Sequence, residues 1–173
     1  MQAQRYNALA DLFTYPGGEY RECVQEYEHL EPALAQFKTE IAPLPTLELQ
    51  ELFTRTFDLN PLCCLEIGWH LFGENYERGA FLVRMRQELR RHGVAESTEL
   101  PDHLSLVLRL LARMEAEQAR DFAAACVLPA LQKMLAAFSG AENPFQSLLL
   151  AVWRVVRGDY PEILISQEPA PLL

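Results

Sequence analysis

The sequence predicts an all-α protein, folded as one helical bundle of about seven to nine helices. Apolar residues recur at helical spacing along almost the whole chain, and no run of alternating apolar and polar residues competes with that pattern. Prolines and glycines divide the chain into segments of helix length. With 173 residues, half of them hydrophobic, the chain can bury a core without help from a metal or a disulfide.

The first three helices are bounded by proline and glycine. A helix is expected over residues 2–15, because the Pro-Gly-Gly sequence at 16–18 cannot continue it. A second helix should follow from about Glu19. A third should start at Pro32, since proline suits the first turn of a helix.

The next helix follows an extended link. Residues 43–45 read Pro-Leu-Pro, which disfavours helix, and Thr46 can then cap a helix that ends near Asn60. Its expected core stripe consists of Leu49, Leu52, Phe53 and Phe57. A short apolar segment at 62–72 precedes a helix capped by Asn75 and stopped at Gly93.

Three further helices are expected. One begins near Pro101, a long one covers about 115–138, and the last starts at Asn143, followed by proline, and ends near Gly158. Pro129 lies inside the long helical pattern, so a kink or a break between two helices is expected there. Residues 1–158 are predicted to form one domain, and 159–173 an extended or loosely ordered tail.

The charge balance narrows the classes of partner. The formal net charge is −9, and the first 60 residues carry ten acids against four bases. Nucleic-acid binding depends on clustered basic residues, so it is not expected. The acidic excess is either a solvated surface or a field that attracts a basic partner. No apolar run reaches the roughly 20 residues of a membrane span, and no signal sequence opens the chain, which favours a cytoplasmic protein.

Metal, cofactor and catalytic motifs are not found. The four cysteines form no C-x-x-C spacing and the four histidines no H-E-x-x-H spacing, so no metal site and no bound cofactor are expected. The cysteines are expected to pack in the core. The arginines at 84, 86, 90 and 91 fit a solvated helix face, which nearby glutamates neutralise.

Asp102-His103 is the most suggestive polar pair. A carboxylate beside an imidazole can serve acid–base chemistry, which would make the chain a small helical enzyme. Neighbours in sequence point apart on a helix, however, and Asp102 can instead cap the N-terminus of the helix that begins near Pro101. His70 is more typical of a hydrogen-bonded core histidine than of a ligand.

Four blocks of sequence, in order, carry a resemblance to a known family. They are 51–59 (ELFTRTFDL), 69–74 (WHLFGE), 77–80 (ERGA) and 99–104 (ELPDHL), flanked by 12–16 (LFTYP), 128–131 (LPAL) and 143–145 (NPF). In this order and spacing they resemble the nitrate reductase delta-subunit family, the NarJ-type molybdenum-cofactor assembly chaperones, over nearly the whole chain. The resemblance implies the all-helical fold of those chaperones and no catalytic activity.

The implied function is binding of the N-terminal segment of a molybdopterin-containing catalytic subunit, most simply a nitrate reductase alpha subunit. The chaperone would keep that apo-subunit competent for cofactor insertion and delay its membrane docking. As peptide-binding residues the resemblance implies Asp102, His103, Arg55, Asp58, His70, Trp69 and Arg78. As residues that shape the groove it implies Phe57, Phe72, Gly73, Gly79, Leu100 and Pro101. The two glycines are expected to serve tight turns or close helix approach.

Two departures from the family pattern leave the client open. The chain lacks a longer acidic C-terminal extension, and residues 63–66 (CCLE) are less polar than expected. The client could then be another molybdopterin oxidoreductase. A helical adaptor without a peptide groove, presenting a flat apolar patch to folded partners, is a further alternative. The chain is expected to be a monomer or a weak dimer.

Overall fold

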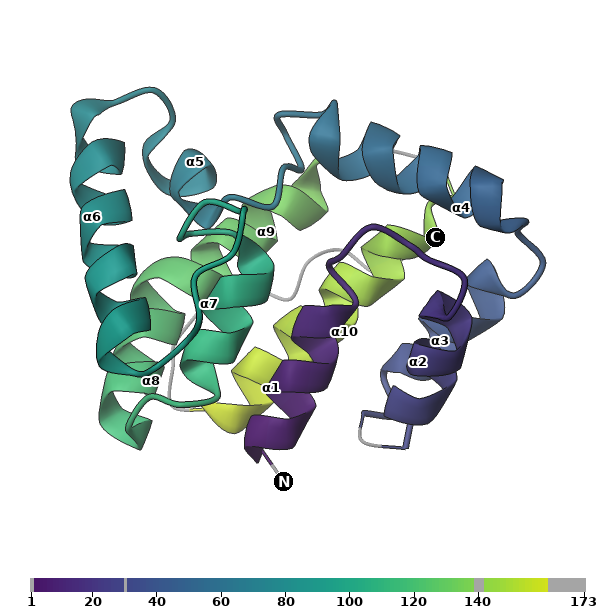
Figure 1. The fold of residues 1–173 in the computed structure, drawn as a ribbon, viewed down its shortest axis with the longest axis horizontal. Helices are drawn as coiled ribbons and strands as arrows, with labels where there is room; N and C mark the ends of the chain where they lie inside the picture. The colour runs from purple at the N-terminus through teal and green to yellow at the C-terminus, as the bar shows by residue number, and fades with distance from the viewer. Residues whose placement is uncertain (1, 30, 139–141, 162–173) are drawn as a thin grey trace.

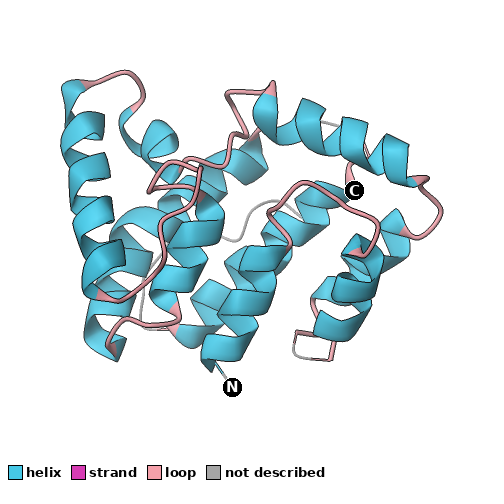
Figure 2. Cartoon of the chain, viewed as in Figure 1, coloured by secondary structure: helices cyan, strands magenta, loops and turns pink. Residues whose placement is uncertain are grey.

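The computed structural model describes residues 2–29, 31–138 and 142–161, and within these ranges regular secondary structure is helical (Figure 2). The elements are α1 (Gln2–Asp11), α2 (Tyr20–Tyr27), α3 (Leu34–Ile41), α4 (Thr46–Phe53), η1 (Thr54–Asp58), α5 (Ile67–Phe72), α6 (Tyr76–Arg91), α7 (Leu104–Leu111), α8 (Ala116–Phe122), η2 (Ala123–Val127), α9 (Leu128–Ala136) and α10 (Pro144–Asp159). The π-helical segments η1 and η2 continue α4 and join α8 to α9, so the described ranges hold nine separate helices. The predicted all-α class is confirmed. No helix in these ranges is long and apolar enough to span a membrane.

The helices pack around α7 and α10 (Figure 1). α1 lies along α7, and α10 contacts both α3 and α9. α10 buries eleven of its sixteen residues, which explains why its sequence is apolar on nearly every face. Asn143 caps this helix by accepting a hydrogen bond from the Phe145 amide at 3.0 Å, as predicted.

An aromatic cluster joins the N-terminal helices to α10. Phe145 lies 5.7 Å from Phe37, 5.5 Å from Phe53 and 5.1 Å from Phe57, measured between ring centroids. Phe13 completes the cluster at 6.1 Å from Phe57. All five side chains are buried, so the predicted stripe at Phe53 and Phe57 does face the core.

Helix boundaries differ from the predictions at three places. The first helix ends at Asp11 rather than near residue 15, with turns at its end. The N-cap position before α4 is Pro45, and Thr46 does not cap it: the Thr46 hydroxyl instead accepts a hydrogen bond from Arg21 at 3.1 Å. Residues 67–72, predicted only as part of an apolar segment, form α5.

Pro129 neither breaks the long helix nor starts a separate one. It occupies the first turn of α9, directly after the π-helical segment η2, and the Leu128 amide bonds back to the Ala123 carbonyl five residues earlier. The wider π turn redistributes the backbone hydrogen bonds just where proline lacks an amide donor. Of the two expected alternatives, the break into two helices is therefore wrong, and a kink at Pro129 stays a prediction. The predicted tail begins at the end of α10, and its residues 162–173 lie outside the described ranges.

Candidate functional site

The predicted site residues converge where the chain enters α5 and α7. Two short segments run antiparallel there and exchange two backbone hydrogen bonds, from the Ile67 amide to the Asp102 carbonyl at 3.0 Å and from the Leu104 amide to the Leu65 carbonyl at 2.8 Å. Figure 1 shows these two loops side by side above the start of α7. Segments more than 30 residues apart in sequence are thus fixed to each other where the two helices begin.

Asp102 caps α5, not the helix that follows it in sequence. Its side chain is fully buried, and one carboxylate oxygen accepts a hydrogen bond from the Gly68 amide at 2.9 Å. Gly68 is the second residue of α5, where amides lack partners inside the helix. Asp102 does cap a helix, as expected, but it caps α5 and not the helix predicted to begin near Pro101. The pKa of the Asp102 carboxyl is raised, mainly because the group is buried. The hydrogen bond from Gly68 lowers this pKa, but by less than burial raises it.

Gly68 is the residue that makes this contact possible. A Cβ atom at that position would lie 2.6 Å from the Asp102 carboxylate and 2.9 Å from the Phe81 ring. Real carbon atoms do not approach that closely, so any side chain would displace Asp102 or Phe81. Gly68 is not among the residues predicted from sequence, although it directly precedes Trp69, the first residue of the WHLFGE block, which was a usable signal.

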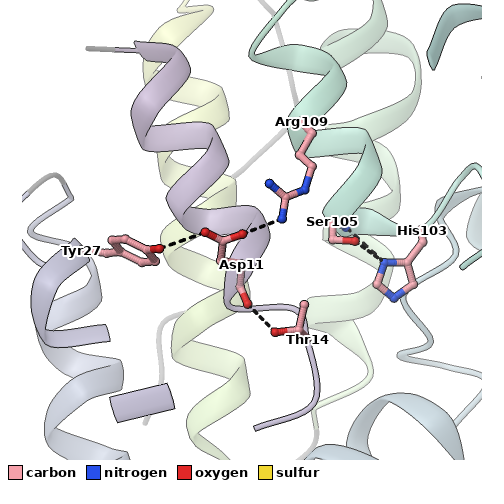
Figure 3. A network of polar contacts seen from close by, with 6 residues as sticks. All are labelled: Asp11, Thr14, Tyr27, His103, Ser105 and Arg109. Carbon is pink, nitrogen blue, oxygen red and sulfur yellow. Dashed lines mark hydrogen bonds and ion pairs between the residues drawn. The ribbon is translucent and has the colours of Figure 1, made fainter. Parts of the chain in front are cut away.

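His103 caps α7. Its Nδ1 atom accepts a hydrogen bond from the Ser105 amide at 3.3 Å and lies 2.7 Å from the Ser105 hydroxyl (Figure 3). Because Nδ1 accepts from the amide, the neutral ring carries its proton on Nε2. Burial lowers the pKa of His103, while carboxylates of Glu99, Glu66 and Asp58 raise it to a lesser extent. The imidazole is therefore neutral at pH 7. Gly68, Asp102, His103 and Ser105 are called the polar junction below.

The surface beside His103 combines acids with exposed leucines. The three carboxylates that act on the imidazole belong to Asp58, Glu66 and Glu99. Leu59 directly follows Asp58 and is 73% exposed, Leu62 is 66% exposed, and Leu100 directly follows Glu99 and is 42% exposed. These six residues are called the Leu100 surface. Three exposed leucines among three acids are typical of a recognition surface for an amphipathic basic segment.

Side chains around α5 hold it against its neighbours. The His70 Nε2 atom lies 2.7 Å from the Cys64 carbonyl, and Lys133 of α9 donates to the His70 carbonyl at 2.6 Å. The Arg78 guanidinium lies over the Trp69 ring at 5.3 Å. Gly73 ends α5 with a φ of 59°, the left-handed conformation that favours glycine.

The remaining predicted residues divide between surface and core. Arg55 near the start of η1 and Asp58 at its end are exposed, and Gly79 is exposed on α6. No described atom lies within 4 Å of a Cβ built on Gly79, so this glycine serves no close helix approach among the residues that the structure describes. Phe57 is 2% exposed in the aromatic cluster and cannot line an open groove. Pro101 is buried, and Phe72 packs on Phe81 at 5.3 Å.

A second polar network, which the sequence analysis missed, fixes three helices near this site. The Asp11 carboxylate at the end of α1 accepts from Tyr27 of α2 at 2.9 Å and from Arg109 of α7 at 2.5 Å (Figure 3). Thr14 bonds the Asp11 carbonyl at 2.7 Å. Burial, followed by the bond to Asp11, raises the pKa of Tyr27 to about 12. Nothing in the local sequence marks Asp11, because its partners lie 16 and 98 residues away.

The geometry does not support an enzyme built on Asp102 and His103. The Asp102 carboxylate has no exposed surface from which to exchange a proton with a substrate, and His103 is occupied as a helix cap. A cavity of about 600 Å³ lies elsewhere, lined by the starts of α1 and α8 and by the ends of α7 and α10. Among the residues that the structure describes, no three His, Cys, Asp or Glu side chains are placed to hold a metal ion.

Comparison with known proteins identifies the family. A family model described as "Nitrate reductase delta subunit" matches residues 23–150, which include α5, α7 and both π-helical segments. The chain belongs to the nitrate reductase delta subunit family. The match covers every residue of the polar junction and of the Leu100 surface.

Three relatives illustrate the similarity. The "Nitrate reductase molybdenum cofactor assembly chaperone NarJ" of Escherichia coli K12 is 32% identical over 88 residues, which are 50% of this chain and 37% of that protein. A probable NarJ chaperone of Bacillus subtilis 168 is 29% identical over 127 residues, 67% of this chain and 68% of that protein. A probable chaperone named NarW from E. coli K12 is 28% identical over 115 residues, 64% of this chain and 50% of that protein. The match to the first relative thus spans little more than a third of its length.

Proposed function

We propose that this chain is a cytoplasmic assembly chaperone, without catalytic activity of its own, for a molybdopterin-containing oxidoreductase. It binds the N-terminal segment of the apo catalytic subunit, most simply that of a nitrate reductase. It thereby assists cofactor insertion before the finished enzyme docks on the membrane. Family membership and the printed names of the relatives support the chaperone role. The Leu100 surface, with its acids gathered around His103, is the observation that supports peptide binding.

The chemistry of the Leu100 surface suits a basic amphipathic segment. Leu59, Leu62 and Leu100 offer apolar contact area, and Asp58, Glu66 and Glu99 supply negative charge beside it. The chain as a whole is acidic, with a net charge of −9, which favours approach of a basic segment over a long range. Binding by contact needs no proton transfer, in agreement with the buried and occupied state of Asp102 and His103.

Residues of the polar junction support the Leu100 surface by holding its loops in place. Asp102 holds the start of α5, and His103 holds the start of α7, so together they fix the loops that carry Glu66 and Leu100. Arg55 and Asp58 of η1 can contact the peptide directly because both are exposed. Trp69, His70 and Arg78 keep α5 in place through their own contacts.

The test is calorimetric titration of the full chain with a synthetic peptide of the client's N-terminus. We expect micromolar binding that weakens as salt rises from about 0.05 M to 0.5 M, because salt screens the acidic contribution. Leu100→Ser should weaken binding about tenfold, the effect of roughly 1.4 kcal/mol of lost apolar contact. Glu99→Gln should weaken it up to about fivefold.

Two controls make the outcome specific. Leu47→Ser changes a leucine that is 67% exposed on α4, outside the Leu100 surface, and should leave affinity unchanged. Peptides from other molybdopterin oxidoreductases, titrated in the same way, identify the client when one of them binds most tightly. Absence of binding by every such peptide, or equal losses for Leu47→Ser and Leu100→Ser, would refute the proposed peptide site. A helical adaptor would instead bind the folded partner and ignore the peptide.

A further inference from the structure

The side of α6 that faces away from the core carries an exposed apolar stripe. Phe81, Met85 and Leu89 turn one side of this helix inward. On the opposite side Tyr76 is 92% exposed and Val83, two turns later, is 59% exposed. Figure 1 shows α6 at the left edge of the molecule, and its inner side contacts α5 and α7. This outer face has no role in the proposed peptide site.

The middle of the outer face is free of bulky side chains. Gly79 and Ala80 are both exposed between Tyr76 and Val83. No atom lies within 4 Å of a Cβ built on Gly79, so the backbone of α6 is open to solvent there. Small residues flanked by large apolar ones allow a second helix to approach closely and to be gripped at both ends of the contact.

Two opposite charges flank this stripe on the same side, and of these only Arg84 acts on a titratable group of the described residues, the Cys126 thiol, whose pKa is raised by burial and lowered by this arginine. Glu77 and Arg84 are seven residues apart, and within the described ranges neither forms an ion pair or a hydrogen bond. Other arginines of α6 are paired: Arg90 lies 2.7 Å from Glu96, and Arg91 lies 3.8 Å from Glu88. The unpaired acid and base are therefore confined to the edge of the apolar stripe.

We propose that α6 pairs antiparallel with α6 of a second copy of this chain, about a two-fold axis that passes beside Ala80. An antiparallel two-fold arrangement brings the same side of both helices together in reverse order. With the axis at Ala80, Val83 of one copy packs against Gly79 of the other. Glu77 of each copy then lies beside Arg84 of the other, which gives two equivalent ion pairs. The outer face is thus complementary to itself in both shape and charge.

The size of this contact predicts a weak dimer. α6 has sixteen residues and is about 24 Å long at 1.5 Å per residue. One helix against one helix covers less than the roughly 800 Å² per partner of a stable interface. The dimer should therefore form at high micromolar concentrations and dissociate on dilution. A two-fold contact is closed, so no larger assembly should follow.

Sedimentation of the full chain up to millimolar concentration tests the proposal through charge reversal. Glu77→Arg leaves two arginines on each copy, and Arg84→Glu leaves two acids, so either variant alone should associate at least tenfold more weakly. An equimolar mixture of these two variants should associate, because each copy then supplies the charge that the other lacks. The double variant E77R/R84E should associate as the wild type does. Gly79→Leu should weaken association by filling the central gap.

The control variant is Glu26→Arg, which reverses an exposed acid on α2 and should leave association unchanged. Melting temperatures of the single variants check that each still folds. A strict monomer at millimolar concentration overturns the proposal. So does a dimer that persists in both single variants, which would use another face, or a mixture of the two variants that fails to associate.

Discussion

The aromatic cluster and the polar junction are both buried, but they are held by different kinds of contact. In the aromatic cluster, three rings contact Phe145, and Phe57 also contacts Phe13 and Phe53. The ring centroids of these pairs are between 5.0 and 6.1 Å apart. Such contacts are numerous and largely non-directional. Removing one carbon atom from this cluster would weaken many contacts slightly, and no single contact there is essential.

The polar junction depends on a few directional contacts. One oxygen of Asp102 meets one amide at 2.9 Å, and the absent side chain of Gly68 leaves just enough room for that oxygen. The other carboxylate oxygen is buried without a hydrogen-bond partner. The aromatic cluster therefore contributes mainly to stability, as part of the larger apolar core, whereas the polar junction sets the register of α5 against α7. Variants in the first should lower stability, and variants in the second should also disturb the Leu100 surface.

The largest expected effect is that of Phe145→Ala. Its ring is fully buried and touches Phe37, Phe53 and Phe57, so truncation removes apolar contact and leaves a cavity. The free energy of unfolding should fall by about 3–5 kcal/mol. Chemical denaturation followed by circular dichroism measures it. Leu47→Ala, at a residue that is 67% exposed, should change it by less than about 0.5 kcal/mol. Similar losses for both variants would contradict the central place of this ring.

The same contrast decides what the sequence could predict. Phe53 and Phe57 were assigned to the core from their spacing, because helical periodicity reports burial wherever apolar residues repeat. The cap formed by Asn143 was likewise predictable, since its partner is two residues away. Local pattern was sufficient in these cases.

Contacts between distant segments were not predictable in this way. The polar character of Asp102 and its position before a helix suggested a cap, but its partner Gly68 lies 34 residues away in a segment that was not recognised as a helix. α5 is only six residues long, too short for its periodicity to be distinguished from an apolar loop. The Asp11 network could not be predicted for the same reason, because only folding brings Tyr27 and Arg109 to Asp11.

The next effect in size is that of Asp102→Ala, which removes the cap of α5 and leaves the buried Gly68 amide without an acceptor. We expect a loss of about 1–3 kcal/mol in the free energy of unfolding, together with weaker peptide binding in the folded protein. Asp102→Asn is the matched variant, since its amide oxygen can still accept from Gly68. It should retain most of the stability and of the binding.

Gly68→Ala approaches the same contact from the opposite side. Its added Cβ would meet the Asp102 carboxylate at 2.6 Å and the Phe81 ring at 2.9 Å, so stability should fall even though alanine favours helix. Combined with Asp102→Ala, it should cost less than the sum of the two single losses, because the first variant removes the atom that the second would strike. Strict additivity of the two losses in denaturation experiments would show that the close approach does not govern this junction.

The smallest expected effect is a pH dependence carried by His103 and His70. Burial lowers the pKa of both imidazoles below 6.5, so the unfolded chain takes up protons more readily than the folded one. Their stabilising contribution is therefore complete above about pH 6.5 and is lost as the pH falls through the folded pKa values. At most about 1.4 kcal/mol is lost per pH unit for each proton taken up on unfolding. The raised pKa of Asp102 has the opposite effect. The contribution of this carboxyl to the free energy of unfolding is complete below about pH 3.8 and is lost as the pH rises through its folded pKa.

His103→Asn separates the cap from the titration. Asparagine is a strong N-cap and can accept from the Ser105 amide, so stability at pH 7.5 should stay within about 0.5 kcal/mol of the wild type. The loss between about pH 7.5 and 5.5 should become smaller, with the remainder due to His70. Denaturant titrations of both proteins at the two pH values give the comparison. An unchanged acid loss in His103→Asn would assign the titration elsewhere. In that case the carboxylates of Glu99, Glu66 and Asp58 would offset the burial of His103 more fully than its position in the polar junction indicates.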